Sequence, residues 1–286
     1  MKINTISRRV AIKSSIFGLV SASIPSVIYA KNMVEVSPNL NTEGKLFYRY
    51  PSIDDEIVSE VVGKSHFDLD RVKELVDKRP ELARATWDWS FGDWESALGA
   101  ASHVGRRDII EYLISKGARP NIFTMASLGA YESVKSIIEH IPGSQKIQGP
   151  HGISLLKHAT LGLRMKENMT SEQIANSEKL IAYLESLGDA DGEVYEDFSD
   201  EDKHKYLGDY KYGDGEKEGF SVKLNMRNMI SLGKLGNFGG GLYKIGNQKF
   251  IYNGVSSVTI TFQLENDLVK SLTVNEPDLT LVAKKI

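Results

Sequence analysis

The chain of 286 residues contains no cysteine. This absence excludes disulfide bonds, thiol nucleophiles and zinc sites built on cysteine ligands. An excess of one charge is also missing, because 35 basic and 38 acidic side chains leave a formal charge of −3 at pH 7. Nucleic acid is therefore not expected as the main partner, since binding to a phosphate backbone needs a basic face.

The remaining composition is that of a soluble globular protein, with 41% hydrophobic and 26% charged residues. The length is sufficient for about two domains. Without disulfides, the stability of both domains must come from packing alone.

The first 30 residues are predicted to be an export signal. They contain basic but no acidic side chains, and the apolar stretch over residues 14–28 is too short and too polar for a good membrane span. Residues 7–13 (SRRVAIK) resemble a twin-arginine signal, with Arg8 and Arg9 as the pair. The resemblance implies a periplasmic or otherwise exported protein with no stable membrane span after signal removal. An uncleaved anchor or a disordered tail is the alternative, and residues 31–54 follow as a linker.

Helical repeats are predicted over residues 55–188. The clearest unit is residues 96–121 (SALGAASHVGRRDIIEYLISKGARPN), in which Gly105 suits a tight turn between two helices. The helix after this turn has an apolar face at helical spacing, formed by Ile109, Ile110, Leu113 and Ile114.

This unit resembles the ankyrin repeat, with degenerate copies at residues 66–76, 123–140 and 152–191. The last copy is interrupted by an expected insertion over residues 163–176. About four units satisfy the need of such arrays for several stacked repeats. The resemblance implies an exported bacterial ankyrin repeat protein. Binding of a protein partner at the concave face of the solenoid is the functional hypothesis that goes with this fold. Another solenoid of helical pairs is the alternative.

The pattern changes in the C-terminal third. Residues 189–204 are rich in acidic side chains and are predicted to be a solvated linker. Residues 205–286 are predicted to be an antiparallel β-domain of short strands, either a curved sheet or a small barrel. Alternation is clearest at Val258, Ile260, Phe262 and Leu264. The expected fold class is thus α + β in separate domains.

No catalytic site is evident in the sequence. None of the six histidines belongs to a closely spaced ligand pair such as H-E-x-x-H, and no serine lies in a G-x-S-x-G elbow. The glycine-rich residues 236–241 lie between strands, where a phosphate loop does not form, and are expected to be a turn. The sequence therefore predicts a non-enzymatic protein with no cofactor and no metal.

All three tryptophans lie in residues 87–94, between the first two repeats. Exposed aromatic side chains suit partner contacts, so the predicted partner-binding residues are Trp87, Trp89, Phe91, Asp93 and Trp94. The alternative is that these rings are covered by the third repeat or by the β-domain. The function predicted from sequence is a protein-interaction scaffold, and small-ligand binding by the β-domain is the alternative.

Overall fold

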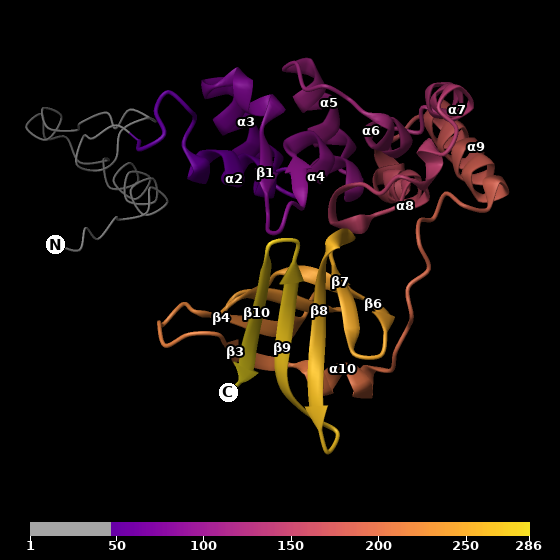
Figure 1. Ribbon diagram of the computed structural model, residues 1–286. Coiled ribbons are helices and arrows are strands. Elements are labelled where there is room, and N and C mark those ends of the chain that lie inside the picture. Colours follow the sequence, from indigo (N-terminus) through magenta and orange to yellow (C-terminus); the bar gives the residue numbers. More distant parts are fainter. Residues whose placement is uncertain (1–46) are drawn as a thin grey trace, which may run out of the picture.

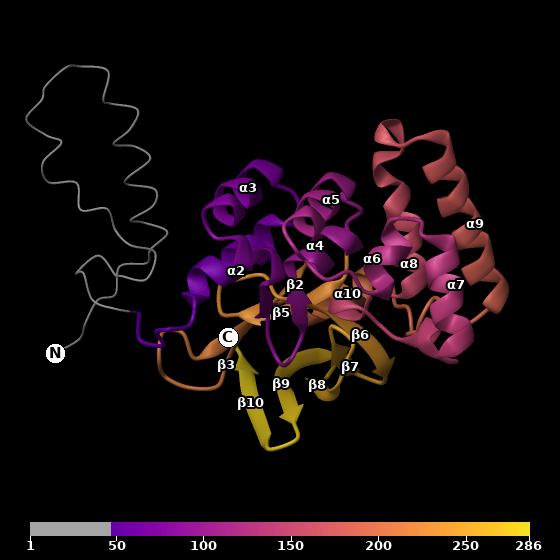
Figure 2. The ribbon, with the colours of Figure 1, turned by 90° about the horizontal axis from the view of Figure 1, so that it is seen from above.

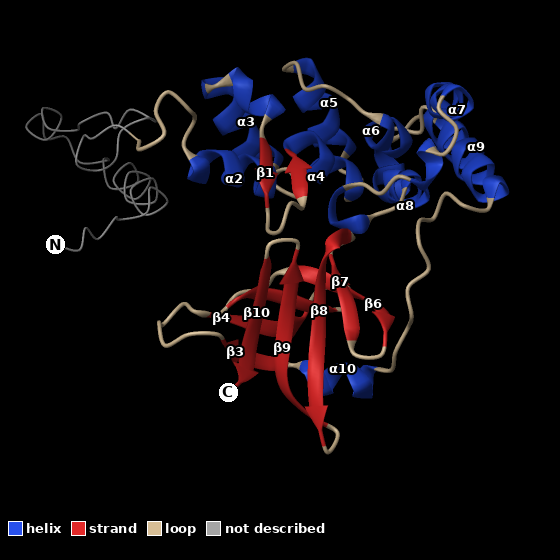
Figure 3. Cartoon of the chain, viewed as in Figure 1, coloured by secondary structure: helices blue, strands red, loops and turns tan. Residues whose placement is uncertain are grey.

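The computed structural model describes residues 47–286, which form a helical array and a β-barrel (Figure 1). Most helices lie apart from the barrel strands, except α10 (Asp200–Tyr206) beside the barrel, and the short β1–β2 hairpin lies among the helices (Figure 3). The predicted combination of α and β structure in separate regions is confirmed. Arg8 and Arg9 lie outside the described residues, so export stays a prediction.

Most helices of the array begin at a capping side chain, while α5 (Arg107–Ser115) and α7 (Tyr131–His140) begin without one. Asp68, Ser96 and Asn121 each accept a hydrogen bond from a backbone amide of the first turn that follows. The helices are α2 Asp55–Lys64, α3 Leu69–Lys78, α4 Ala97–His103, α5 Arg107–Ser115, α6 Ile122–Ser127, α7 Tyr131–His140, α8 Leu155–Leu161 and α9 Ser171–Leu187. Short 3-10 segments connect them at Pro80–Arg84, Ser144–Lys146, Pro150–Gly152 and Gly162–Asn168.

The helices stack in consecutive pairs (Figure 2). The first helices of the pairs, α2, α4, α6 and α8, contact one another in a row, while α3 contacts α5 and α7 contacts α9. Buried side chains form one core over α2 to α5 and a second over α6 to α9. Each pair therefore buries its apolar face against its neighbours, as the repeat pattern predicts.

Gly105 lies in the turn between α4 and α5 and has a φ of +70°. A Cβ at this position would lie 1.9 Å from the carbonyl oxygen of Leu161 in α8. Glycine is favoured at this position for two reasons: its φ is positive, and the neighbouring helix pair approaches too closely to leave room for a Cβ.

The expected insertion at residues 163–176 is shorter than predicted. Helix α9 begins at Ser171, because Thr170 and Gln173 form a reciprocal capping box at its first turn. The capping residues outweigh the weak hydrophobic pattern on which the sequence-based boundary rested.

The C-terminal strands close into an antiparallel barrel in the order β10-β3-β4-β5-β6-β7-β8-β9. The strands are β3 Gly208–Lys211, β4 Gly219–Leu224, β5 Ile230–Lys234, β6 Gly240–Gly246, β7 Lys249–Tyr252, β8 Val255–Glu265, β9 Leu268–Glu276 and β10 Leu279–Lys285. Of the two alternatives from sequence, the barrel is confirmed. Residues 236–239 lie between β5 and β6, as expected for a turn, whereas Gly240 and Gly241 begin β6.

The barrel core is filled by large side chains. Tyr210, Phe250 and Phe262 are fully buried there. Aliphatic side chains from β4, β5, β6, β8, β9 and β10 pack in the same core. Val258, Ile260 and Phe262 are buried and Leu264 packs partly buried against the same core, so the predicted alternation is confirmed, and the register shift between Gln263 and Leu264 does not interrupt it. A filled core weighs against the alternative of a small-ligand cavity inside the β-domain.

The acidic linker is also shorter than predicted. Helix α10 occupies Asp200–Tyr206, where Ser199 caps the first turn and acidic residues precede basic ones. This charge order suits the helix dipole. Within residues 47–286, none of the helices has the length and apolar character needed to cross a membrane.

Candidate metal centre

A short hairpin places Glu95 in the interior of the helical array. Strands β1 (Thr86–Asp88) and β2 (Trp94–Ser96) are antiparallel, with Trp87 opposite Glu95. Neighbouring residues of a strand point to opposite faces. Trp94 is accordingly 63% exposed, whereas Glu95 is fully buried at 0%.

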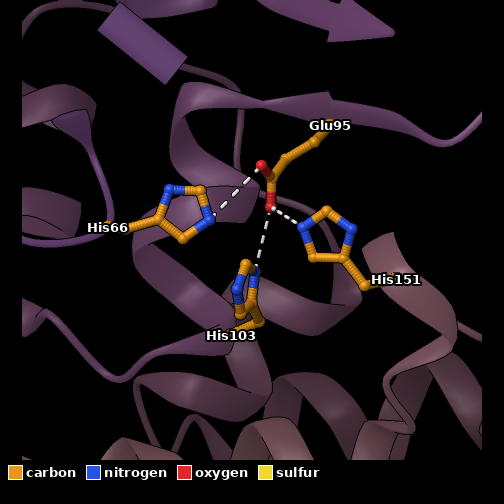
Figure 4. A group of neighbouring side chains, drawn as sticks. All are labelled: His66, Glu95, His103 and His151. Carbon is orange, nitrogen blue, oxygen red and sulfur yellow. Dashed lines mark ion pairs between the residues drawn. The ribbon is translucent and has the colours of Figure 1, made fainter. Parts of the chain in front are cut away.

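Three histidines from three other segments surround the Glu95 carboxylate (Figure 4). His66 follows α2, His103 is the last residue of α4, and His151 lies in the 3-10 turn Pro150–Gly152. The nearest nitrogen–oxygen distances from Glu95 are 3.5 Å to His66 Nε2, 3.0 Å to His103 Nδ1 and 3.2 Å to His151 Nε2. One donor atom from each of the four residues lies within 4.8 Å of the others. We call these four residues the histidine–glutamate cluster.

The inner atoms are close without being aligned for hydrogen bonds. Glu95 Oε1 lies near both His103 and His151, yet it has no hydrogen-bond partner, and neither has His103 Nδ1. Both atoms are buried, where an unsatisfied polar atom costs about 1–3 kcal/mol. Buried donor atoms that lie close together without hydrogen-bond partners are an arrangement expected where a metal ion binds.

Contacts on the outer side fix the orientation of the ligands. His66 Nδ1 donates to the Gly63 carbonyl over 3.0 Å, and His151 Nδ1 donates to Asp93 Oδ2 over 2.7 Å. In each ring the Nε2 atom is then left facing Glu95. Trp89 Nε1 donates to Glu95 Oε2 over 2.7 Å, which holds the carboxylate from behind. Such outer hydrogen bonds are the usual support of metal-binding histidines.

The electrostatics of the cluster favour a bound positive charge. Burial would raise the pKa of Glu95, but the neighbouring imidazoles of His103 and His151 outweigh it and hold the pKa well below its usual range. Burial would lower the pKa of His151, but the carboxylates of Asp93 and Glu95 outweigh it and raise the pKa to about 9. Burial lowers the pKa of His103. In the absence of a metal, the positive charge beside Glu95 is therefore the proton on His151, and a metal ion would have to displace this proton to bind.

The donor set fits a divalent transition metal. Imidazole nitrogen with carboxylate oxygen suits Zn²⁺ and its neighbours, and a tetrahedral zinc site separates its ligand atoms by roughly 3.3 Å. From Glu95 Oε1, the distances to His103 Nδ1 and His151 Nε2 are 3.0 and 3.2 Å, close to this spacing, whereas His66 Nε2 lies 3.5 Å from the other carboxylate oxygen, Oε2. Four protein donors make a closed coordination sphere, which is the structural type of zinc site.

The five predicted partner-binding residues make different contacts in the structure. Trp87 packs against the first helical core, and Trp89 bonds to Glu95. Phe91 lies at the hairpin tip with a φ of +60° and its ring contacts Tyr252 of the barrel at 4.8 Å between centroids. Asp93 is buried beside His151. Trp94 is the most exposed of the five at 63%, and Trp89 is exposed at 36%, whereas Trp87, Phe91 and Asp93 are partly or fully covered.

Sequence reasoning did not single out the histidine–glutamate cluster. Its members are spread over residues 66–151 in four segments, and no two lie at a ligand spacing. One weak signal is present in the sequence: His66 and His103 both fall at the end of the first helix of a pair, where stacking brings equivalent positions together.

In comparisons with known proteins, the chain matches neither a family model nor a curated protein. The function of the chain is therefore inferred from the geometry of this site.

Proposed function

We propose that this protein is a non-enzymatic metal-binding protein whose histidine–glutamate cluster holds one divalent transition ion, with Zn²⁺ as the best match. The observation that carries the proposal is the convergence of four donor atoms within 4.8 Å of one another in the protein interior. The unpartnered Glu95 Oε1 and His103 Nδ1 support it, because a metal would satisfy both atoms at once.

The alternative reading is an ion pair between Glu95 and a protonated His151. That pair would leave Glu95 Oε1 without a properly aligned bond, and it assigns no role to the Nε2 atom of His66. A metal accounts for all four side chains, which is why we favour it.

Zinc titration of the metal-free full-length protein by calorimetry tests the proposal. We expect one Zn²⁺ per chain, with Ni²⁺ and Mn²⁺ as competitors that report selectivity. His66→Gln removes the most accessible ligand and should weaken zinc binding by at least about 100-fold, since even outer-shell changes cost 10–100-fold. His140→Gln is the matched control, because His140 lies on α7 and bonds only to its own helix at Ser136. Equal affinity of wild type and His66→Gln, or no zinc binding by the wild type, would refute the metal site.

We also propose that the helical array is of the ankyrin type. The stacked pairs support this, as do the hairpin that precedes α4 and the matching φ values of Gly105 and Gly129, +70° and +71°. These two glycines occupy the same place in successive pairs.

A protein-interaction scaffold is the second candidate function, favoured by the position of Trp94. This ring is 63% exposed and borders a hollow of about 570 Å³ that Trp87, Leu82 and Arg84 also line. Trp94→Ala should weaken binding of a protein partner by roughly 2 kcal/mol while leaving zinc affinity unchanged. Unchanged partner binding would remove the hairpin from the interface.

A further inference from the structure

The histidine–glutamate cluster lies at the junction between the helical array and the barrel, and the barrel reaches it through Asn253. The Asn253 amide donates to Asp93 Oδ2 over 2.6 Å, and the same oxygen accepts from His151 Nδ1 over 2.7 Å. Asn253 Oδ1 in turn accepts from the backbone amide of Gly241 in β6 over 2.7 Å. A continuous hydrogen-bonded path, buried from Asp93 onward, therefore runs from a candidate metal ligand to a barrel strand.

The main chain of His151 is held by the barrel as well. Its carbonyl oxygen accepts from the hydroxyl of Tyr243 over 2.9 Å, and its φ of +59° is unusual for a residue other than glycine. Next to it, Gly152 lies against Gly254, where a Cβ on Gly254 would come within 2.7 Å of the Gly152 Cα. A strained conformation of this kind persists only when its surroundings impose it, and here the barrel supplies part of those surroundings.

The helical array alone supports His151 less completely. From that side, Asp93 bonds to the backbone amide and to Nδ1 of His151, but Asp93 itself is shared with Asn253. Loss of the barrel would leave the carbonyl of His151 without its donor Tyr243, and Asp93 without its donor Asn253. The position of Nε2 would then be less well defined, and the metal would lose a preorganised ligand.

We infer that metal binding and docking of the barrel onto the helical array are thermodynamically coupled through His151, with Asn253 and Tyr243 as positioning residues. The inference rests on the proposed metal site and adds its regulation. By reciprocity, the docked barrel raises the affinity for the metal, and the bound metal favours the docked arrangement by the same factor. Removal of the metal loosens the junction between the two domains.

Barrel variants that touch no candidate ligand atom of the cluster test the coupling. Asn253→Gly removes the amide without forcing a side chain into a positive φ, since Asn253 has a φ of +45°. Tyr243→Phe deletes one hydroxyl only. Asn266→Gly is the matched control, because Asn266 also has a positive φ but lies in the β8–β9 hairpin, which points away from the helices (Figure 1).

We expect calorimetric zinc titration to show a loss of affinity of about 10-fold for Asn253→Gly and a smaller loss for Tyr243→Phe. The Asn266→Gly protein should bind like the wild type. Small-angle scattering of the wild type should show a larger radius of gyration after removal of zinc by a chelator, and zinc should restore the original value. Strand content by circular dichroism checks that each variant keeps its barrel.

The outcomes separate the two proposals. If the wild type binds no zinc, the metal site fails and the coupling fails with it. If the wild type binds zinc but both Asn253→Gly and Tyr243→Phe bind it equally well, the coupling is wrong while the metal site stands. An affinity loss as large in Asn266→Gly as in Asn253→Gly would likewise overturn the role assigned to the junction.

Discussion

The helical array and the barrel differ in whether their buried polar side chains have hydrogen-bond partners. Among residues 47–286, the buried side-chain atoms without a hydrogen-bond partner all lie in the array, on Glu95, His103, Arg107, Ser127, Ser144 and His158. Buried polar side chains of the barrel are bonded, as Ser231 is to the carbonyl of Lys223 and Asn253 is to Asp93. Unsatisfied polar atoms destabilise a fold, so a cluster of them marks a region shaped by something besides stability.

This contrast indicates that the two domains have different tasks. Two residues of the histidine–glutamate cluster have unpartnered atoms, and a third such atom is Nε2 of His158, whose ring neighbours that of His103. Burial lowers the pKa of His158 to about 4, which keeps this imidazole neutral near pH 7. The barrel instead has a filled apolar core and supports the array at its junction.

Removal of a large ring from the barrel core should produce the largest effect. Phe262 is 1% exposed and packs against Tyr206 and Phe250, so Phe262→Ala should lower the free energy of unfolding by about 4 kcal/mol. Strand circular dichroism follows the barrel, whereas tryptophan fluorescence follows the array, which contains all three tryptophans. Because the cores are separate clusters, we expect the strand signal to shift further than the fluorescence.

Phe238→Ala is the control for this experiment, since Phe238 is 70% exposed and its loss should cost less than about 1 kcal/mol. Equal shifts of both signals in Phe262→Ala would mean that the array and the barrel unfold as one cooperative unit. The two domains would then differ in the bonding of their buried polar groups, but they would not differ in their stability toward unfolding.

A glycine pair sharpens the comparison within the array. Gly105 and Gly117 both have positive φ, +70° and +90°, but a Cβ meets backbone only at Gly105. Gly117→Ala should therefore cost about 1 kcal/mol from backbone strain, and Gly105→Ala on the order of 3 kcal/mol because a neighbouring pair must also move. Urea unfolding followed by tryptophan fluorescence measures both. Equal losses would contradict the close stacking of α4 on α8.

Local patterns made most of this fold predictable. Helical spacing and turn glycines are encoded over ten to thirty residues, so the repeat around Gly105 was visible in the sequence. Alternation over residues 258–262 likewise revealed a strand, although the register shift at Gln263 depends on β9 and could not be read from β8 alone. Boundaries failed where capping decided them, as at Ser171.

The candidate site was not predictable by the same means. His66, Glu95 and His151 converge only after the pairs have stacked and the hairpin has turned inward at Phe91 and Gly92. The sequence did concentrate attention on residues 87–94, and two of those residues support the site: Trp89 bonds to Glu95, and Asp93 bonds to His151. Their role as supports follows from contacts between distant segments, which no spacing rule contains.

Two buried serines test the polar contrast at the smallest scale. Ser127 in the array is 1% exposed and its hydroxyl has no partner, whereas Ser231 in the barrel is fully buried and donates to the Lys223 carbonyl over 2.9 Å. Ser127→Ala removes an unsatisfied group and should be neutral or stabilise the protein by up to about 1 kcal/mol. Ser231→Ala removes a bond and leaves the Lys223 carbonyl without that donor, which should cost about 1 kcal/mol. The same chemical change is thus expected to have opposite signs in the two domains. Thermal unfolding with fluorescence for the array and strand circular dichroism for the barrel measures each effect in its own domain. A loss of stability in Ser127→Ala equal to that in Ser231→Ala would show that the hydroxyl of Ser127 is satisfied in solution, and the contrast would narrow to the histidine–glutamate cluster and its immediate neighbours.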